Sequence, residues 1–259
     1  MNILDKIIEA KKEEVKNRKQ SSPIQELEKK LLFKTDCFSL KDALLNVDKT
    51  GIITEFKRQS PSKGIINNTS TVKEVTAAYA KYGASALSVL TDKVFFGGSL
   101  QDLVEAREQQ IPLLRKDFML DEYQLIESKA YGADIILLIA ACLTVMEVKH
   151  LAIFAKNLGL NVLLEIHDQV ELEHICAEID VVGINNRNLK DFKVDIHHSI
   201  ELGNLIPPGK IKIAESGIHD LQTLELLKSH GFQGFLMGEI FMKEENPGEA
   251  FQNFAEMLS

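Results

Sequence analysis

From residue 51 onward, short apolar runs alternate with longer amphipathic stretches along the chain. The apolar runs cover residues 51–56, 85–90, 112–116, 134–139, 162–166, 180–185, 210–215 and 234–238, and the first contains the β-branched Ile52, Ile53 and Thr54 that are typical of a buried strand. The stretches between them have apolar positions at helical spacing, over residues 72–82, 100–109, 121–131, 144–158, 169–177, 197–202, 219–229 and 251–258. The pattern predicts eight successive strand–helix units.

Strands that alternate with helices form a parallel sheet with right-handed crossovers. Eight such units in ~200 residues fit a closed (β/α)8 barrel, or TIM barrel. The rival is an open doubly wound sheet, which should carry a glycine-rich phosphate turn after its first strand. Neither G-x-G-x-x-G nor a P-loop occurs in the sequence, so we predict an α/β fold of the (β/α)8 class.

The first fifty residues contain helical patterns and no predicted strand. An apolar stripe opens this region, formed by Ile3, Leu4, Ile7 and Ile8. Ser22 and Pro23 are typical of a second helix start, with Ser22 as N-cap and Pro23 at the first helical position. That second helix would bury Leu27, Leu31 and Leu32. We therefore expect one domain over residues 1–259, in which 1–48 form a helical N-terminal extension.

Composition limits the classes of partner. The formal net charge is -8, which argues against non-specific nucleic-acid binding and means that a local group of Lys and Arg must attract any anionic substrate. The longest apolar run, at 135–143, is too short to span a membrane, and the first residues show no signal-peptide pattern. Cys37, Cys142 and Cys176 match neither a disulfide framework nor a metal motif, so we expect a cytoplasmic protein.

Charged and amide side chains stand at the carboxyl ends of six of the predicted strands. They are Glu55 and Lys57, Arg115 to Asp117, Glu165 and His167, Asn185 to Arg187, Glu215, and Glu239. In a (β/α)8 barrel these carboxyl ends share one rim, where catalytic residues lie, and converging charges there are costly unless they serve a function. Glu55 and Lys57 share a face because side chains alternate along a strand. From that stretch alone, a surface ion pair at a strand end stays an alternative.

The ends of the seventh and eighth strands also predict a phosphate site. Ser216, Gly217, Gly238 and Glu239 place backbone N–H groups where a ligand can approach, as in the phosphate sites of many barrels. Arg187 would add a charged donor. The alternative is that these glycines serve only tight turns.

Six ordered motifs resemble those of the indole-3-glycerol-phosphate synthase family. They are EFKRQSPS at 55–62, LRKDF at 114–118, LEIH at 164–167, GINNRNL at 183–189, AESGI at 214–218 and FLMGE at 235–239. The resemblance covers essentially the whole chain, including the helical extension. It implies a decarboxylating and dehydrating ring closure of 1-(2-carboxyphenylamino)-1-deoxyribulose 5-phosphate to indole-3-glycerol phosphate, in tryptophan biosynthesis. Glu239 departs from the Ser that is frequent there, so we expect only its backbone N–H to help bind phosphate.

The resemblance also implies roles for individual residues. Lys116 would be the general acid of the condensation, and Glu165 and Lys57 would share the proton transfers of the dehydration. Glu55 would orient Lys57, while Asn185 and Glu215 would hold the lysines and the ribulose hydroxyls. An apolar wall for the aromatic ring would come from Phe118, Leu137 and Leu189. Phosphate would be bound by Ser60, Arg187, Ser216, Gly217, Gly238 and the backbone of Glu239.

Several alternatives and lesser features remain at this point. Phosphoribosylanthranilate isomerase would need a Cys near the first strand end, where Glu55 stands, and a non-catalytic phosphate-binding barrel is the other alternative. The loop 95–99 either covers the site or packs on the N-terminal helices. We expect His167 at the rim without a catalytic role, and Asp117 facing away from Lys116. We expect no metal or other cofactor, no nucleic-acid or membrane partner, and a monomer, with a weak dimer as the alternative.

Overall fold

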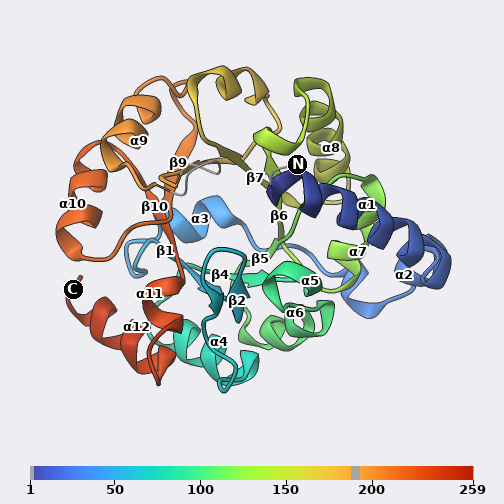
Figure 1. Ribbon diagram of the computed structural model, residues 1–259, viewed down its shortest axis with the longest axis horizontal. Coiled ribbons are helices and arrows are strands. Elements are labelled where there is room, and N and C mark those ends of the chain that lie inside the picture. The colour runs from blue at the N-terminus through green and yellow to red at the C-terminus, as the bar shows by residue number, and fades with distance from the viewer. Residues whose placement is uncertain (1–2, 188–192, 259) are drawn as a thin grey trace.

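The computed structural model describes residues 3–187 and 193–258, and within them eight parallel strands close into a barrel (Figure 1). The strands are β1 (Ile52–Phe56), β4 (Ala86–Leu90), β5 (Leu113–Lys116), β6 (Ile135–Ile139), β7 (Asn161–Ile166), β8 (Val181–Asn185), β9 (Ile211–Glu215) and β10 (Gly234–Met237). They pair in sequence order, and β1 also pairs with β10 to close the ring. The predicted (β/α)8 barrel is confirmed, with each strand within one residue of its expected bounds.

The alternation of side chains along each strand builds two apolar layers. Ile52 belongs to the layer between strands and helices, whereas Ile53 belongs to the barrel interior. Leu40 and Leu44 of helix α3 (Leu40–Leu45) pack in that interior cluster and close the end at which the strands begin. The opposite end is left for polar side chains.

Helices of the outer layer follow most of the strands. They are α4 (Val72–Lys81), α6 (Leu100–Ala106), α7 (Glu122–Ala130), α8 (Val145–Asn157), α9 (Ile196–Gly203), α10 (Leu221–Ser229) and α12 (Pro247–Glu256). Short elements lie among them: α5 (Lys93–Phe96), η2 (Arg107–Gln109), η3 (Ala140–Cys142), η4 (Gln169–His174) and α11 (Glu239–Met242).

Two of the expected helices differ from the structure. The segment expected at 169–177 is only the 3-10 helix η4, because none of its residues is buried to hold a longer helix in place. The helix expected from residue 251 begins at Pro247, because Asn246 caps the backbone N–H of Glu249 and proline suits the first helical position.

Four helical elements precede β1, namely α1 (Ile3–Ser21), α2 (Ile24–Leu27), η1 (Leu31–Lys34) and α3. The expected N-cap at Ser22 is wrong: its N–H still bonds to the end of α1, and Pro23 takes the cap position without a side-chain hydrogen bond. Of the apolar stripe expected at Leu27, Leu31 and Leu32, Leu27 is buried as predicted, but α2 ends there and Leu31 is 82% exposed.

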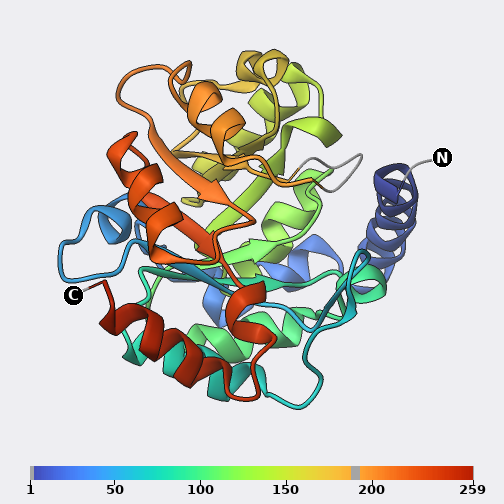
Figure 2. The ribbon, with the colours of Figure 1, turned by 60° about the vertical axis from the view of Figure 1, so that its left-hand side comes forward.

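Helix α1 lies on the same side of the molecule as the small hairpin formed by β2 (Gln59–Ser60) and β3 (Gly64–Ile65) (Figure 2). Residues of both line one pocket at the carboxyl ends of the strands. No helix in the described part of the chain is long and apolar enough to cross a membrane.

Candidate active site

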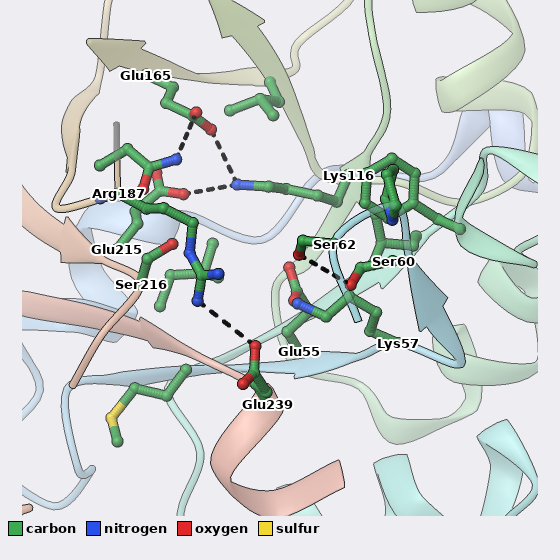
Figure 3. A pocket seen from close by; sticks show the side chains of 18 of the residues that line it. Glu55, Lys57, Ser60, Ser62, Lys116, Glu165, Arg187, Glu215, Ser216 and Glu239 are labelled. Carbon is green, nitrogen blue, oxygen red and sulfur yellow. Dashed lines mark hydrogen bonds and ion pairs between the residues drawn. The ribbon is translucent and has the colours of Figure 1, made fainter. Parts of the chain in front are cut away.

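A pocket occupies the carboxyl-terminal mouth of the barrel (Figure 3). Every predicted site residue that the structure describes lines it: Glu55, Lys57, Ser60, Lys116, Phe118, Glu165, Asn185, Arg187, Glu215, Ser216, Gly217, Gly238 and Glu239. Leu137 lines it too, whereas Leu189 lies outside the described residues. The strand-end rule therefore brought together side chains from six strands and the loops after them.

Lys116, at the end of β5, lies between two carboxylates. Its Nζ is 2.6 Å from Glu215 Oε2 and 3.1 Å from Glu165 Oε2, and the three side chains converge from different strands (Figure 3). Burial lowers the pKa of Lys116, but the charges of Glu165 and Glu215 outweigh it and hold this pKa above its usual value. Lys116 is therefore a cation that can donate a proton or a hydrogen bond into the pocket.

Glu55 and Lys57 form a second ion pair, from the end of β1. Lys57 Nζ is 2.7 Å from Glu55 Oε1, and Glu55 is only 4% exposed. The alternative of a surface ion pair is thus wrong, because both side chains line the pocket. Gly238 allows this packing, since a Cβ there would come within 2.6 Å of Glu55 Cβ.

Glu215, at the end of β9, is almost fully buried and has one unpaired oxygen. Its Oε2 accepts from Lys116, whereas Oε1 has no hydrogen-bond partner. Burial raises the pKa of Glu215 to about 7, against the opposing charge of Lys116. A carboxyl group in this state can give or take a proton near neutral pH.

Glu165 has the opposite environment. Asn185 Nδ2 donates to its Oε1 at 2.9 Å, and His167 Nε2 lies 3.1 Å from the same oxygen. Burial raises the pKa of Glu165, but Lys116 and His167 outweigh it and hold this pKa below its usual range. Glu165 is therefore an ionised carboxylate, whereas Glu215 next to it is poised to titrate.

His167 has more contact with the site than the sequence predicted. Burial lowers its pKa, but the nearby carboxylates of Glu165 and Glu171 outweigh burial and raise this pKa to about 10. His167 is thus a second cation beside Glu165. The same-face spacing of Glu165 and His167 was the signal for this contact, while the position of Glu171, on η4, was not predictable from the strand pattern.

Most of the residues expected to bind phosphate follow β8, β9 and β10. Ser216 and Gly217 have φ values of 66° and 70°, an unusual left-handed pair, and Asn186 Nδ2 donates to the Ser216 carbonyl at 2.6 Å. Arg187 Nη2 lies 3.5 Å from Glu239 Oε2 (Figure 3). The Glu239 side chain thus pairs with the predicted phosphate ligand Arg187, a contact that the sequence did not indicate.

The remaining wall of the pocket is apolar. It is formed by Ile3, Leu4, Ile7, Leu90, Phe96, Phe118, Leu137 and Ile139. The Phe96 and Phe118 ring centroids are 6.2 Å apart. Of the two alternatives for the loop 95–99, the position of Phe96 favours the one in which the loop covers the site.

The described residues contain no group of three or more His, Cys, Asp or Glu side chains arranged to hold a metal ion. The pocket is lined by the lysines Lys57 and Lys116, the carboxylates Glu55, Glu165 and Glu215 and the amide of Asn185, beside an apolar wall and an end that carries Arg187 and Glu239. This set is suited to acid–base catalysis on an anionic substrate with an aromatic part.

Comparisons with known proteins agree with this chemistry. The sequence model of the family described as "Indole-3-glycerol phosphate synthase" matches residues 4–254. The chain is 46% identical over 258 residues to the indole-3-glycerol phosphate synthase of Bacteroides thetaiotaomicron, covering 99% of both chains. It is 46% identical to that of Campylobacter jejuni subsp. doylei, covering 96% of this chain and 98% of the other.

Among solved structures, a chain of the tryptophan synthase complex from Pyrococcus furiosus is similar in fold. Its TM-score is 0.60 at 14% identity, over 82% of this chain and 98% of the other. At that identity the likeness concerns the barrel alone.

Proposed function

The chain belongs to the indole-3-glycerol phosphate synthase family, and from this membership we propose how its pocket residues divide the reaction between them. The enzyme closes the five-membered ring of 1-(2-carboxyphenylamino)-1-deoxyribulose 5-phosphate. Carbon dioxide and water leave, and indole-3-glycerol phosphate is formed. The acceptor is a ketone, so the first requirement is a donor beside its oxygen.

Lys116 supplies that donor in our proposal. Its ammonium protonates the ketone oxygen as the ring carbon that carries the carboxylate attacks the ketone carbon. The observation that supports this role best is its position between Glu165 and Glu215, which keeps it charged inside the pocket. Loss of carbon dioxide then restores the aromatic ring.

Dehydration needs one group to protonate the departing hydroxyl and another to remove a proton from the neighbouring carbon. We assign these transfers to Lys57 and Glu165, on opposite sides of the pocket. Glu55, paired with Lys57 at 2.7 Å, orients it and stabilises positive charge on the anilino nitrogen. Asn185 and Glu215 hold the lysine and the ribulose hydroxyls.

The two ends of the substrate differ in chemistry, and so do the two ends of the pocket. We place the phosphate at Ser60, Arg187 and the backbone N–H groups of Gly217, Gly238 and Glu239. The Ser216–Gly217 turn and the room at Gly238 support this placement. The aromatic ring then lies against Phe118 and Leu137.

One experiment tests the activity directly: appearance of indole fluorescence when the purified protein meets the anilino-deoxyribulose phosphate. The chain contains no Trp, so product indole is seen without a protein indole background. No signal from folded protein would overturn the proposal. The isomerase alternative lacks support, because Glu55 stands where that enzyme needs a Cys and the described lining of the pocket contains none.

We further propose that the enzyme works as a monomer in the cytoplasm. The described pocket draws its acid, base and cationic groups from a single chain, so no second subunit is needed to complete it. Cys37, Cys142 and Cys176 are free thiols, as a reducing compartment would keep them. Sedimentation of the purified enzyme at working concentration tests the monomer.

A further inference from the structure

Lys11, on helix α1, is a cation buried outside the barrel. It is 1% exposed, and its Nζ lies 2.7 Å from Glu14, 2.9 Å from Asp92 and 2.9 Å from Asp117. A buried ammonium is tolerated only when carboxylates surround it, so these contacts fix where α1 sits on the barrel. Glu14 is on α1 itself, whereas Asp92 and Asp117 belong to the loops after β4 and β5.

Asp92 orders the loop that carries Phe96. Its Oδ1 accepts from the backbone N–H of Phe95 at 2.7 Å and so caps α5. Its carbonyl accepts from the N–H of Gly98 at 2.8 Å, at the other end of the same turn. Phe96 therefore reaches the pocket from a turn whose backbone is held by two hydrogen bonds to Asp92.

Asp117 fixes the backbone at Phe118. Its Oδ1, the oxygen that contacts Lys11, accepts from the backbone N–H of Phe118 at 2.9 Å. Its Oδ2 accepts from Thr91 at 2.6 Å and Arg115 at 3.1 Å. As expected, Asp117 turns away from Lys116, and it anchors the backbone between the general acid and the aromatic ring.

Helix α1 itself supplies the third side. Ile3, Leu4 and Ile7 line the pocket, and Ile7 lies one helical turn before Lys11 on the same face. One ammonium thus connects three segments that are distant in sequence, and each of them presents apolar side chains to the same wall.

We propose that Lys11 is a positioning residue that assembles the aromatic subsite of this enzyme. It holds Phe96, Phe118 and the α1 side chains Ile3, Leu4 and Ile7 around the carboxyphenyl ring of the substrate, with the reacting ring carbon toward Lys116. The inference rests on the proposed function, since it takes the ring of that substrate as the occupant. Lys11 does not contact the residues assigned to the phosphate. Its replacement should therefore weaken binding of the aromatic end alone, whereas a general loss of structure would weaken binding of both ends.

The test compares Lys11→Met with Lys19→Met. Lys19 is also on α1 and pairs with a barrel carboxylate, Asp121, at 2.7 Å, but this pair is largely exposed and neither residue lines the pocket. The measurements are kcat, KM, the Kd of the substrate analogue whose ketone is reduced to an alcohol, and the inhibition constant of inorganic phosphate.

Lys11→Met should raise KM and the Kd of the analogue by roughly tenfold, the loss expected from a misplaced aromatic wall, while the phosphate constant stays unchanged. Lys19→Met should match the wild type, and Lys11→Arg should recover most of the loss. Asp92→Asn, which keeps the helix cap but removes one charge, should shift the same constants in the same direction, and it decides the question if Lys11→Met does not fold.

Unchanged analogue binding in folded Lys11→Met or in Asp92→Asn would overturn the inference, and so would parallel losses for analogue and phosphate. Failure of the proposed function looks different: the wild type itself would form no indole, whatever Lys11 does to analogue binding.

Discussion

Gly183, on β8, leaves the space that the Glu215 carboxylate occupies: a Cβ at Gly183 would come within 2.2 Å of Glu215 Oε1. Gly183→Ala should therefore displace the Glu215 carboxylate and weaken its ion pair with Lys116. We expect kcat to fall about 100-fold, as misplacement of a catalytic group by about 1 Å does, with a loss of roughly 1–3 kcal/mol in the free energy of unfolding. Steady-state kinetics and urea unfolding measure the two effects.

Gly203→Ala is the matched control for this substitution. A Cβ there would meet the Phe232 ring at 2.9 Å, away from the pocket. Its free energy of unfolding should fall by a similar amount while kcat stays near the wild-type value. Equal kcat values for Gly183→Ala and Gly203→Ala would show that catalysis does not depend on the position of the Glu215 carboxylate.

Lys116→Met should abolish turnover. The substitution removes the cation that we assign as general acid, a loss on the order of 10³-fold or more in kcat. It also leaves Glu165 and Glu215 without their shared partner. Circular dichroism should show an intact barrel, and an intact barrel with retained activity would exclude this role.

Arg187→Ala should mainly raise KM. Its guanidinium lies 3.5 Å from Glu239 and lines the pocket, where a phosphate could bind it. We expect KM and the inhibition constant of inorganic phosphate to rise about 10- to 100-fold with little change in kcat. Lys243→Ala removes an exposed charge near the end of α11, paired only loosely with Glu244, and serves as control. A large fall in kcat at unchanged KM would contradict the assignment.

The stability of the enzyme should depend on pH through His167. Its pKa rises from 6.5 to about 10 on folding, so the folded protein binds the extra proton more tightly. The stabilisation is complete below pH 6.5 and is lost as pH rises toward 10, by an amount on the order of 5 kcal/mol. Urea unfolding between pH 6.5 and 9 should therefore show a steeper fall for the wild type than for His167→Gln. Parallel pH profiles would mean that His167 titrates alike in the folded and unfolded states.

The loop 60–64 should become ordered when phosphate binds. The β2–β3 pairing closes this loop, but across the pocket Lys63 Nζ lies 3.7 Å from Glu239 Oε1 and is largely exposed, which makes that contact weak. Crystals grown with and without inorganic phosphate should differ in the B-factors of Ser60 and Lys63 relative to the barrel. Equal values in both would count against a loop that responds to the anion.

Local sequence was sufficient to predict the barrel, because each β-branched run, such as Ile52 to Thr54, is buried on both faces. It was also sufficient to bring Glu55, Lys57 and Lys116 together, since strand ends of a parallel barrel must meet. The local pattern gave a wrong prediction for η4, which lacks a buried face. It was also wrong at Ser22, whose backbone N–H bonds to the Arg18 carbonyl at the end of α1.

The contacts that set the positions and charges of the site residues could not be predicted from local sequence patterns, for another reason. The room for Glu215 comes from Gly183 on a different strand, and the charge of His167 depends on Glu171 in the 3-10 helix η4. One of the contacts that anchor Asp117 comes from Lys11, which is far away in sequence. Such contacts follow from three-dimensional packing, so a pattern read along one segment cannot contain them.

The position of Ile3 in the lining of the pocket has a practical consequence for handling the protein. Any affinity tag or reporter fused ahead of α1 would begin beside the substrate entrance, whereas the C-terminus lies on the other side of the molecule (Figures 1 and 2). A tag for assays or immobilisation should therefore be fused to the C-terminus. A fluorophore attached ahead of Ile3 would, for the same reason, report ligand entry directly.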